Sequence, residues 1–136
     1  MTADALLAVD RAVDELRRGR PVVVTDGTTR LAAMALDLAT DDTVAAFEAR
    51  AGGTAHLLIS GRRAQVLKIT GDARAAGHQV VMIEREPRAD LGFLLSVADP
   101  VEDLAAPLKG PFRPLAMGAH ETAGQAAIEL AKAARL

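Results

Sequence analysis

The sequence has few aromatic residues: 2% of its 136 residues are Phe, Tyr or Trp, although 50% are hydrophobic. We therefore expect a core of small and branched aliphatic side chains, and the platforms on which single-stranded nucleic acids stack are missing. The absence of cysteine excludes disulfides, thiolate metal sites and a cysteine nucleophile. No apolar run approaches the ~20 residues that cross a bilayer, and the opening MTAD is acidic rather than signal-like. These features predict a cytoplasmic protein without a membrane segment.

The charge is nearly balanced. Sixteen Lys and Arg against eighteen Asp and Glu leave a formal net charge of −2. Nucleic-acid binding needs a clustered positive field, which this composition does not favour. A chain of this length has room for one hydrophobic core, so we expect a single domain over residues 1–136.

Hydrophobic periodicity predicts three helices. Residues 6–16 place Leu and Val at helical spacing, with Thr2 as a cap and Gly19 as a stop. Residues 40–53 begin with a capping TDD and end with two glycines. Residues 122–135 form a closing helix, whose expected inner face is Ala127, Ile128, Ala131 and Leu136.

Short apolar runs between these helices predict strands. They are residues 22–24, 55–60, 79–84, 91–97 and 112–116. Residues 31–38 fit a helix or a buried strand, residues 61–67 fit one or two helical turns, and residues 100–111 contain three prolines. The irregular mixture predicts an α/β fold, or α+β, with a mixed central sheet flanked by helices.

The common catalytic motifs are missing. The histidines His56, His78 and His120 are scattered without ligand spacing, so we expect no metal site. Neither a phosphate-binding glycine loop before Lys-Ser/Thr nor a Gly-x-Ser-x-Gly elbow occurs. The charged run at residues 84–88 is interpreted as a solvated loop.

Polar residues cluster at 25–30 (TDGTTR), after the apolar strand at 22–24. Open α/β sheets bind ligands at the carboxyl ends of their strands, which makes Asp26, Thr28 and Arg30 ligand candidates. The alternative is an ordinary Asp-Gly turn.

Two further clusters involve histidine. In residues 118–122 (GAHET), backbone N–H groups, His120 and Thr122 are candidates for holding an anion; the alternative is helix capping by Thr122 or Glu121 beside a solvated histidine. His56 lies in the apolar run 55–60, where it is either a packed core residue or a ligand contact.

In chain order, these segments resemble the 3,4-dihydroxy-2-butanone 4-phosphate synthase family, which converts ribulose 5-phosphate to a four-carbon phosphate and formate in riboflavin biosynthesis. Residues 12–26 (AVDELRRGRPVVVTD) resemble its opening helix, turn and first strand, and residues 40–53 resemble its "T-x-E-x-V-x-F-x-x-R-x-G-x-G" helix. Residues 91–97 resemble its "T-G-F-T-V-S-V" strand, residues 110–115 its "G-H-V-F-P-L", and residues 126–136 its "E-A-A-V-D-L-A-R-L-A-G-L" segment. His56 falls near a pocket cysteine of the family.

The chemistry of the family is largely absent from the matching positions. Its acidic "D-D-E-D-R-E-N-E-G-D" loop binds Mg²⁺, whereas residues 26–33 (DGTTRLAA) contain one carboxylate. The family histidine of "G-H-V-F-P-L" falls on Pro111, and the family continues beyond the position of Leu136 to a strand with a catalytic Glu. The resemblance thus implies a trimmed synthase fold without the parent activity, without bound Mg²⁺, and, as in the family, a homodimer.

Three functions follow from this interpretation. In the first, the chain is a non-catalytic relative that binds a protein partner or a small polar or phosphorylated molecule. The candidate binding residues are Asp26, Thr28, Arg30, His56, His120 and Thr122. Alternatively, it is a repurposed enzyme acting on another sugar phosphate or small polar substrate. The third possibility is an unrelated α/β interaction domain.

Overall fold

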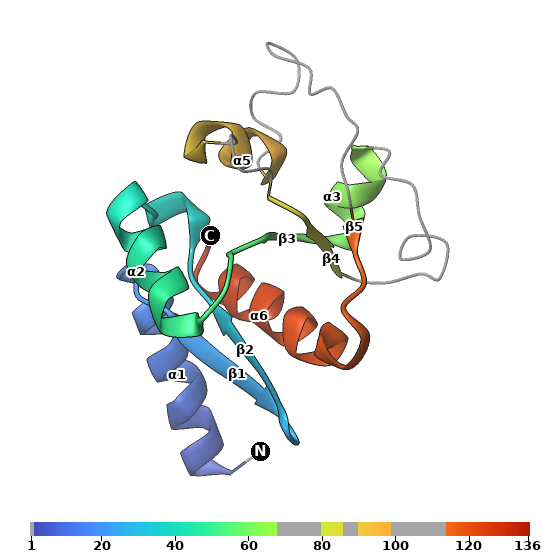
Figure 1. Cartoon of the computed structure of the whole chain (residues 1–136). Helices are drawn as coiled ribbons and strands as arrows, with labels where there is room; N and C mark the ends of the chain where they lie inside the picture. Colours follow the sequence, from blue (N-terminus) through green and yellow to red (C-terminus); the bar gives the residue numbers. More distant parts are fainter. Residues whose placement is uncertain (1, 68–79, 86–89, 99–113) are drawn as a thin grey trace.

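Helices and strands intermix along the chain, which confirms the expected α/β class (Figure 1). The computed structural model describes residues 2–67, 80–85, 90–98 and 114–136. Its elements in order are α1 (Ala3–Arg17), β1 (Val22–Asp26), β2 (Thr29–Ala33), η1 (Leu36–Leu38), α2 (Asp41–Ala51), β3 (Leu57–Ser60), α3 (Gly61–Val66), β4 (Val80–Ile83), α5 (Leu91–Ala98), β5 (Pro114–Leu115), η3 (Gly118–His120) and α6 (Glu121–Ala133).

The strands of the described residues form two antiparallel sheets rather than one mixed sheet. One is the hairpin β1–β2, and the other has the order β3–β4–β5. A two-residue connection between β1 and β2 permits only an antiparallel pair, since parallel strands need a long crossover. The expectation of a strand at residues 22–24 holds, but this strand extends to Asp26 and Val23 is 53% exposed.

The first two predicted helices are confirmed together with their caps. The Thr2 hydroxyl accepts a hydrogen bond from the N–H of Ala5 at 3.1 Å and starts α1. Thr40 and Thr43 exchange side-chain-to-backbone bonds at the start of α2, and Gly52 ends it with φ +77°. Both ends of α2 are therefore encoded locally, because these residue types satisfy the unpaired backbone groups of a helix.

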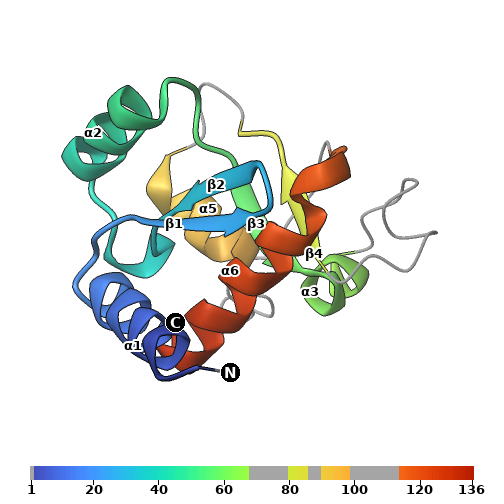
Figure 2. The ribbon, with the colours of Figure 1, turned by 90° about the horizontal axis from the view of Figure 1, so that it is seen from below.

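Helix α6 lies between the two sheets. It packs against β1 and β2 on one side, against β3 and β4 on the other, and also against α1 (Figures 1 and 2). Its buried residues are small: Ala123, Gly124 and Ala127. A Cβ on Gly124 would lie 2.7 Å from Cε of Met117 and 3.5 Å from Cγ2 of Val80, so glycine permits the close approach of α6 to the sheet. The small side chains of this helix thus allow contacts on several sides.

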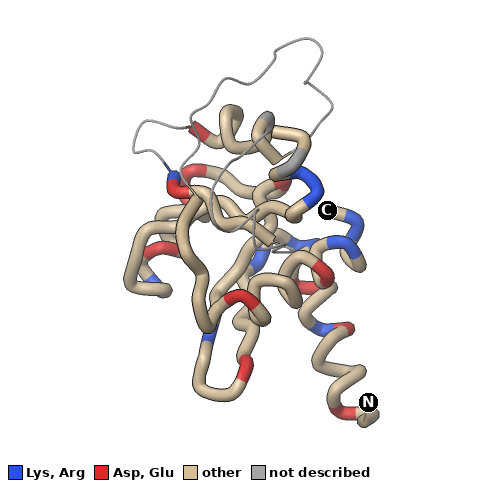
Figure 3. Tube along the Cα trace, turned by 90° about the vertical axis from the view of Figure 1, so that its right-hand side faces the viewer, with Lys and Arg blue, Asp and Glu red and all other residues tan. Residues whose placement is uncertain are grey.

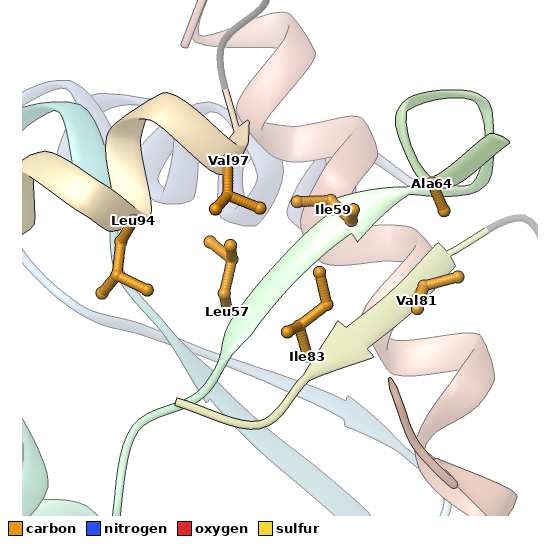
Figure 4. Close-up of a cluster of buried hydrophobic side chains, with 7 residues drawn as sticks. All are labelled: Leu57, Ile59, Ala64, Val81, Ile83, Leu94 and Val97. Atoms are coloured by element: carbon orange, nitrogen blue, oxygen red, sulfur yellow. The ribbon is translucent and has the colours of Figure 1, made fainter. Parts of the chain in front are cut away.

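The main hydrophobic cluster covers one face of the β3–β4–β5 sheet (Figure 4). Leu57 pairs with Ile83 and Ile59 with Val81, so these four side chains share one face. Helices α3 and α5 cover that face with Ala64, Leu94 and Val97. The described core contains no aromatic residue, as the composition predicts.

The prediction of a strand at residues 91–97 is wrong, because these residues form helix α5. Asp90 accepts a hydrogen bond through Oδ1 from the N–H of Phe93 at 2.8 Å, which is an N-terminal cap. Leu91, Leu94 and Val97 follow at three-residue spacing and face the core. The run is apolar over its length, and such a run does not distinguish strand from helix.

The remaining predictions for single segments have mixed outcomes. Residues 31–38 divide between β2 and η1, and residues 61–67 form the expected short helix, α3. Leu136, expected on the inner face of the last helix, is 36% exposed and lies beyond the end of α6. The predictions for residues 100–111, including Pro111, and for His78 lie outside the described residues.

Candidate functional site

A cleft of about 700 Å³ lies among β2, β3, α2, α5 and α6. Its walls are mostly aliphatic, with side chains that include Leu31, Phe47, Leu58, Leu94 and Ile128. Small-molecule sites have this size and this mixture of apolar walls with a few polar groups. The cleft is thus the candidate site among the described residues.

The charged groups lining this cleft are mainly basic. It is lined by Arg30, Arg63, Arg85 and Lys132 together with His56 and His120, whereas Asp37 is the one acidic side chain among the described lining residues. Charges of both signs are otherwise spread over the described chain (Figure 3). The balance in the cleft therefore differs from the balance of the whole sequence, which is slightly acidic.

Three of these basic residues have structural partners, namely Arg63, Lys132 and Arg85. Arg63 is 8% exposed, and its Nε donates to the carbonyl oxygen of Val97 at 2.8 Å, near the end of α5. Lys132 lies 3.3 Å from Glu129 in an ion pair whose side chains are 61% and 63% exposed. The first contact is buried and fixes α3 against α5, whereas the second is solvated and weak.

Arg85, which lines the cleft, joins three segments of the chain. Its Nη2 lies 3.2 Å from Oε1 and 3.3 Å from Oε2 of Glu48 in α2. The same carboxylate accepts the N–H of Ala55 at 2.8 Å, and the backbone N–H of Arg85 donates to Nδ1 of His56 at 3.3 Å. Glu48, Arg85 and the residues Ala55 and His56 before β3 are therefore connected in a closed ring of contacts.

Arg30 differs from these groups because it has no side-chain hydrogen bond or ion pair to any described residue. It lies on β2 opposite Thr25, on the hairpin face that also contains Val23 and Ala32. Strand β2 packs against η3, the turn that contains His120. An exposed guanidinium at the cleft, with its donors available, can bind an anionic oxygen.

The structure brings three of the six candidates from the sequence to this cleft: Arg30, His56 and His120. Asp26 and Thr28 lie at the tip of the β1–β2 hairpin and are not among the lining residues. Gly27 has φ +60° there, which is the conformation expected of a tight hairpin turn. Of the two interpretations of this cluster, the structure confirms the Asp-Gly turn and not the ligand loop, because β1 continues directly into β2.

The sixth candidate, Thr122, is exposed in the first turn of α6 and does not line the cleft. His120 occupies the N-cap position of this helix without a side-chain capping bond, so the expected capping by Thr122 or Glu121 is wrong. The reason is that η3 continues directly into α6 and shifts the helix start one residue earlier.

His56 lies just before β3 rather than within it, because the strand begins at Leu57. Its side chain is exposed and lines the cleft. The expectation of a histidine packed among Leu57, Leu58 and Ile59 is therefore wrong. Alternation explains the difference, since Leu57 and Ile59 already fill the buried face.

Sequence patterns do not reveal Glu48 and Arg85. The run at residues 84–88 is interpreted from its charges as a solvated loop, yet the side chain of Arg85 is 23% exposed and is paired with Glu48. These two residues are 37 positions apart, and no local spacing encodes such a pair.

The described residues contain no group of three His, Asp or Glu side chains placed to hold a metal ion. None of the described helices is both long enough and apolar enough to cross a membrane.

Comparison with protein-family models and with solved structures finds no significant match. A curated protein from Xylella fastidiosa named GTP cyclohydrolase-2 is 33% identical over 133 residues, which cover 97% of this chain. The aligned part is 30% of that protein, so this chain is similar to less than one third of its relative.

Proposed function

We propose that this chain binds a small phosphorylated molecule in the cleft and does not catalyse the synthase reaction of the family that it resembles. The observation that carries the proposal is the excess of basic over acidic side chains in an otherwise aliphatic cleft. Arg30 contributes a permanent positive charge and planar donors suited to phosphate. His56 and His120 supply further polar groups at the same cleft.

The apolar walls restrict the ligand to a molecule with both a charged and a carbon-rich part. Inorganic phosphate alone would leave most of a cleft of about 700 Å³ unfilled. A sugar phosphate meets the charge requirement, because its anionic group can pair with Arg30, and the oxygens along its chain can bond to His56 and His120. Ribulose 5-phosphate, the substrate of the resembled family, is therefore the first probe.

The absence of synthase activity follows from the residues at the position of the family's acidic loop. Residues 26–33 contain one carboxylate, Asp26, and a hard divalent ion held by one protein carboxylate and waters binds weakly. The reaction needs enolisation, a skeletal shift and formate release, and each missing acid or base lowers the rate by about 10²–10⁴. We expect no formate when the pure protein is incubated with ribulose 5-phosphate and Mg²⁺. Formate at an ordinary enzyme turnover rate would refute this part.

This chain is similar to part of a protein named for GTP cyclohydrolase. That similarity is consistent with this proposal if the aligned part is a different domain from the cyclohydrolase. The 133 aligned residues are 30% of that protein, so it is about 440 residues long and exceeds the usual size of one domain. We propose that the aligned part is a synthase-like domain and that the cyclohydrolase for which the relative is named belongs to the rest of its chain. Accordingly, we expect GTP not to be consumed by this chain alone.

Calorimetric titration with ribulose 5-phosphate tests the binding proposal. Arg30→Gln should weaken binding about tenfold or more, because a charged hydrogen bond to the phosphate is lost. Arg50→Gln is the matched control, since Arg50 is exposed on α2 and does not line the cleft. Equal effects of the two variants, or no binding by the unchanged protein, would refute the proposal.

A repurposed enzyme is the second candidate, and the shared location of His56 and His120 favours it. Imidazoles can transfer protons near neutral pH, so two of them on one cleft could serve as acid and base for another sugar phosphate. Conversion of sugar phosphates that depends on His120, followed by NMR of the mixture, would support catalysis. Binding without conversion would favour the non-catalytic function.

We also propose that the protein is a homodimer, as the resembled family is. The chain exposes large apolar side chains, among them Leu6 at 52% and Leu7 at 48% on α1, and a second copy would remove such surface from water. Light scattering at micromolar concentration should give twice the chain mass. A monomer mass would contradict this expectation.

A further inference from the structure

The ring of contacts that includes His56 determines which nitrogen of its imidazole faces a ligand. A neutral imidazole has one donor nitrogen and one acceptor nitrogen, and the partner of one nitrogen fixes the role of the other. Nδ1 of His56 accepts the backbone N–H of Arg85 at 3.3 Å. An acceptor nitrogen cannot also hold a proton, so the proton of the neutral ring is on Nε2.

The backbone of Arg85 is itself held in place. Its side chain contacts both carboxylate oxygens of Glu48, at 3.2 and 3.3 Å, and both side chains are 23% exposed. A pair with this burial is screened less by water and salt than a fully exposed pair. Glu48 also accepts the N–H of Ala55, the residue before His56, at 2.8 Å. The carboxylate of Glu48 therefore fixes both the N–H of Arg85, which donates to Nδ1, and the backbone next to His56.

From this geometry we propose that His56 contacts the ligand as a fixed N–H donor through Nε2, with Glu48 and Arg85 as positioning residues. The contact with the ligand rests on the proposed function. The assignment of the tautomer rests only on the hydrogen bonds that join Glu48, Arg85 and His56. His56 lines the cleft, and with Nδ1 occupied, Nε2 is the nitrogen left for a ligand.

This arrangement selects one chemical class of ligand group. A neutral His56 in this tautomer donates to an oxygen with lone pairs, such as a phosphate, carboxylate or carbonyl oxygen, and has no ring acceptor left for a hydroxyl or ammonium donor. Together with Arg30 at the same cleft, it favours an anionic group. Sugar alcohols without phosphate are therefore expected to bind weakly.

Nuclear magnetic resonance of the ligand-free protein tests the tautomer without reference to any ligand. With ¹⁵N-labelled protein and the imidazole neutral, Nε2 should be protonated. Nδ1 should show a through-hydrogen-bond coupling to the amide nitrogen of Arg85. Glu48→Gln removes the charge of the pair but keeps an amide oxygen for Ala55, and it should weaken or abolish this coupling. A proton on Nδ1, or no coupling in the unchanged protein, would overturn the inference.

Glu15→Gln is the matched control for Glu48→Gln. Glu15 also pairs with an arginine, Arg20, at 3.4 Å, but this pair is more exposed, at 37% and 61%, and does not line the cleft. We expect the His56–Arg85 coupling to be unchanged in this variant. If both variants change it equally, Glu48 acts through general stability rather than as a positioning residue.

The ligand contact is tested by titrating ribulose 5-phosphate into two variants of His56. Glutamine places its amide nitrogen near the position of Nε2, whereas asparagine places it near Nδ1. His56→Asn should weaken binding about tenfold or more, since a hydrogen bond to a charged group is lost, and His56→Gln should retain affinity within about threefold. Equal affinities of both variants would refute the contact through Nε2. If the unchanged protein does not bind the probe although the tautomer is confirmed, the proposed function fails and the ligand contact fails with it.

Discussion

The two sheets are built from similar strand residues but differ in burial. In β3 and β4, Leu57, Ile59, Val81 and Ile83 are all at most 8% exposed. In the β1–β2 hairpin no residue is fully buried, and Val23 is 53% exposed. The reason is coverage: helices α3, α5 and α6 pack on the first sheet, whereas α6 and α1 contact the hairpin.

Because of this difference, the β3–β4–β5 sheet contributes mainly to stability, whereas the β1–β2 hairpin supplies Arg30 for the proposed binding. In the three-stranded sheet, one set of alternate side chains fills the core, and the residues that this sheet contributes to the cleft, such as Leu58 and Met82, are mostly apolar. In the hairpin, Val24 and Leu31 form one face, while Thr25 and Arg30 form the other. Arg30 is thus held by a strand whose packing depends on other residues, so it can be replaced at small cost in stability. Each of the following substitutions tests this separation.

The largest effect on the free energy of unfolding is expected in the β3–β4–β5 sheet, which helices cover. Ile59→Ala removes buried methyl and methylene groups at a site 3% exposed and should lower the free energy of unfolding by about 2–5 kcal/mol. Urea unfolding followed by circular dichroism measures the change. Val23→Ala in the hairpin is the comparison, and we expect a loss below about 1 kcal/mol because its side chain is largely solvated. Similar losses at both sites would show that the hairpin contributes to the core as much as the covered sheet does.

The next largest effect on stability is expected for Arg63, the buried arginine of α3. Arg63→Met keeps much of the side-chain volume but leaves the carbonyl oxygen of Val97 without the donor that lies 2.8 Å away. We expect a loss of about 1.5–3 kcal/mol, the usual range for a hydrogen bond to a charged group. Arg62→Met, on the exposed side of α3, is the control and should change stability by less than about 0.5 kcal/mol. An equal loss in both variants would indicate an effect of α3 propensity instead.

The sequence predicts the features that are encoded by neighbouring residues. The caps of α1 and α2 and the glycine that ends α2 are local, and their positions are recognisable from Thr2, Thr40 and Gly52. The all-aliphatic core follows from composition. The strand prediction for residues 91–97 fails because helix and strand produce the same uniformly apolar run, and the capping role of Asp90 is not evident from that run.

Three of the six site residues that the sequence suggests do line the cleft. Arg30, His56 and His120 stand out as polar residues in unusual places, and the fold brings them to one cleft. Asp26 and Thr28 do not join them because β1 turns back into β2 at the Asp-Gly turn, which is the alternative that the sequence offers for this cluster. Glu48 and Arg85 meet only through tertiary packing, so their roles cannot be found from spacing.

A smaller effect is expected at the tip of the hairpin. Gly27 has φ +60°, where a side chain costs about 1–2 kcal/mol for most residues, so Gly27→Ala should lower the free energy of unfolding by about 1 kcal/mol. Gly53→Ala is the control, because a Cβ there has open space and no positive φ. Since the hairpin tip lies away from the cleft lining, ribulose 5-phosphate binding should be unchanged in the folded Gly27→Ala protein. Lost binding would show that the turn, and with it Asp26 and Thr28, contributes to the site.

The smallest effect is expected for Glu129→Gln. Glu129 lies 3.3 Å from Lys132, but the side chains are 63% and 61% exposed, so the pair should contribute less than about 0.5 kcal/mol to stability. Lys132 lines the cleft, and removing its carboxylate partner leaves the positive charge more available to an anion. We therefore expect unfolding to be unchanged and binding of ribulose 5-phosphate to tighten by at most about twofold, because solvent and salt screen an exposed charge. Raising the salt concentration should remove this gain while the larger loss in Arg30→Gln persists. Weaker binding in Glu129→Gln would mean that the carboxylate itself contacts the ligand, which contradicts an anionic ligand beside Lys132.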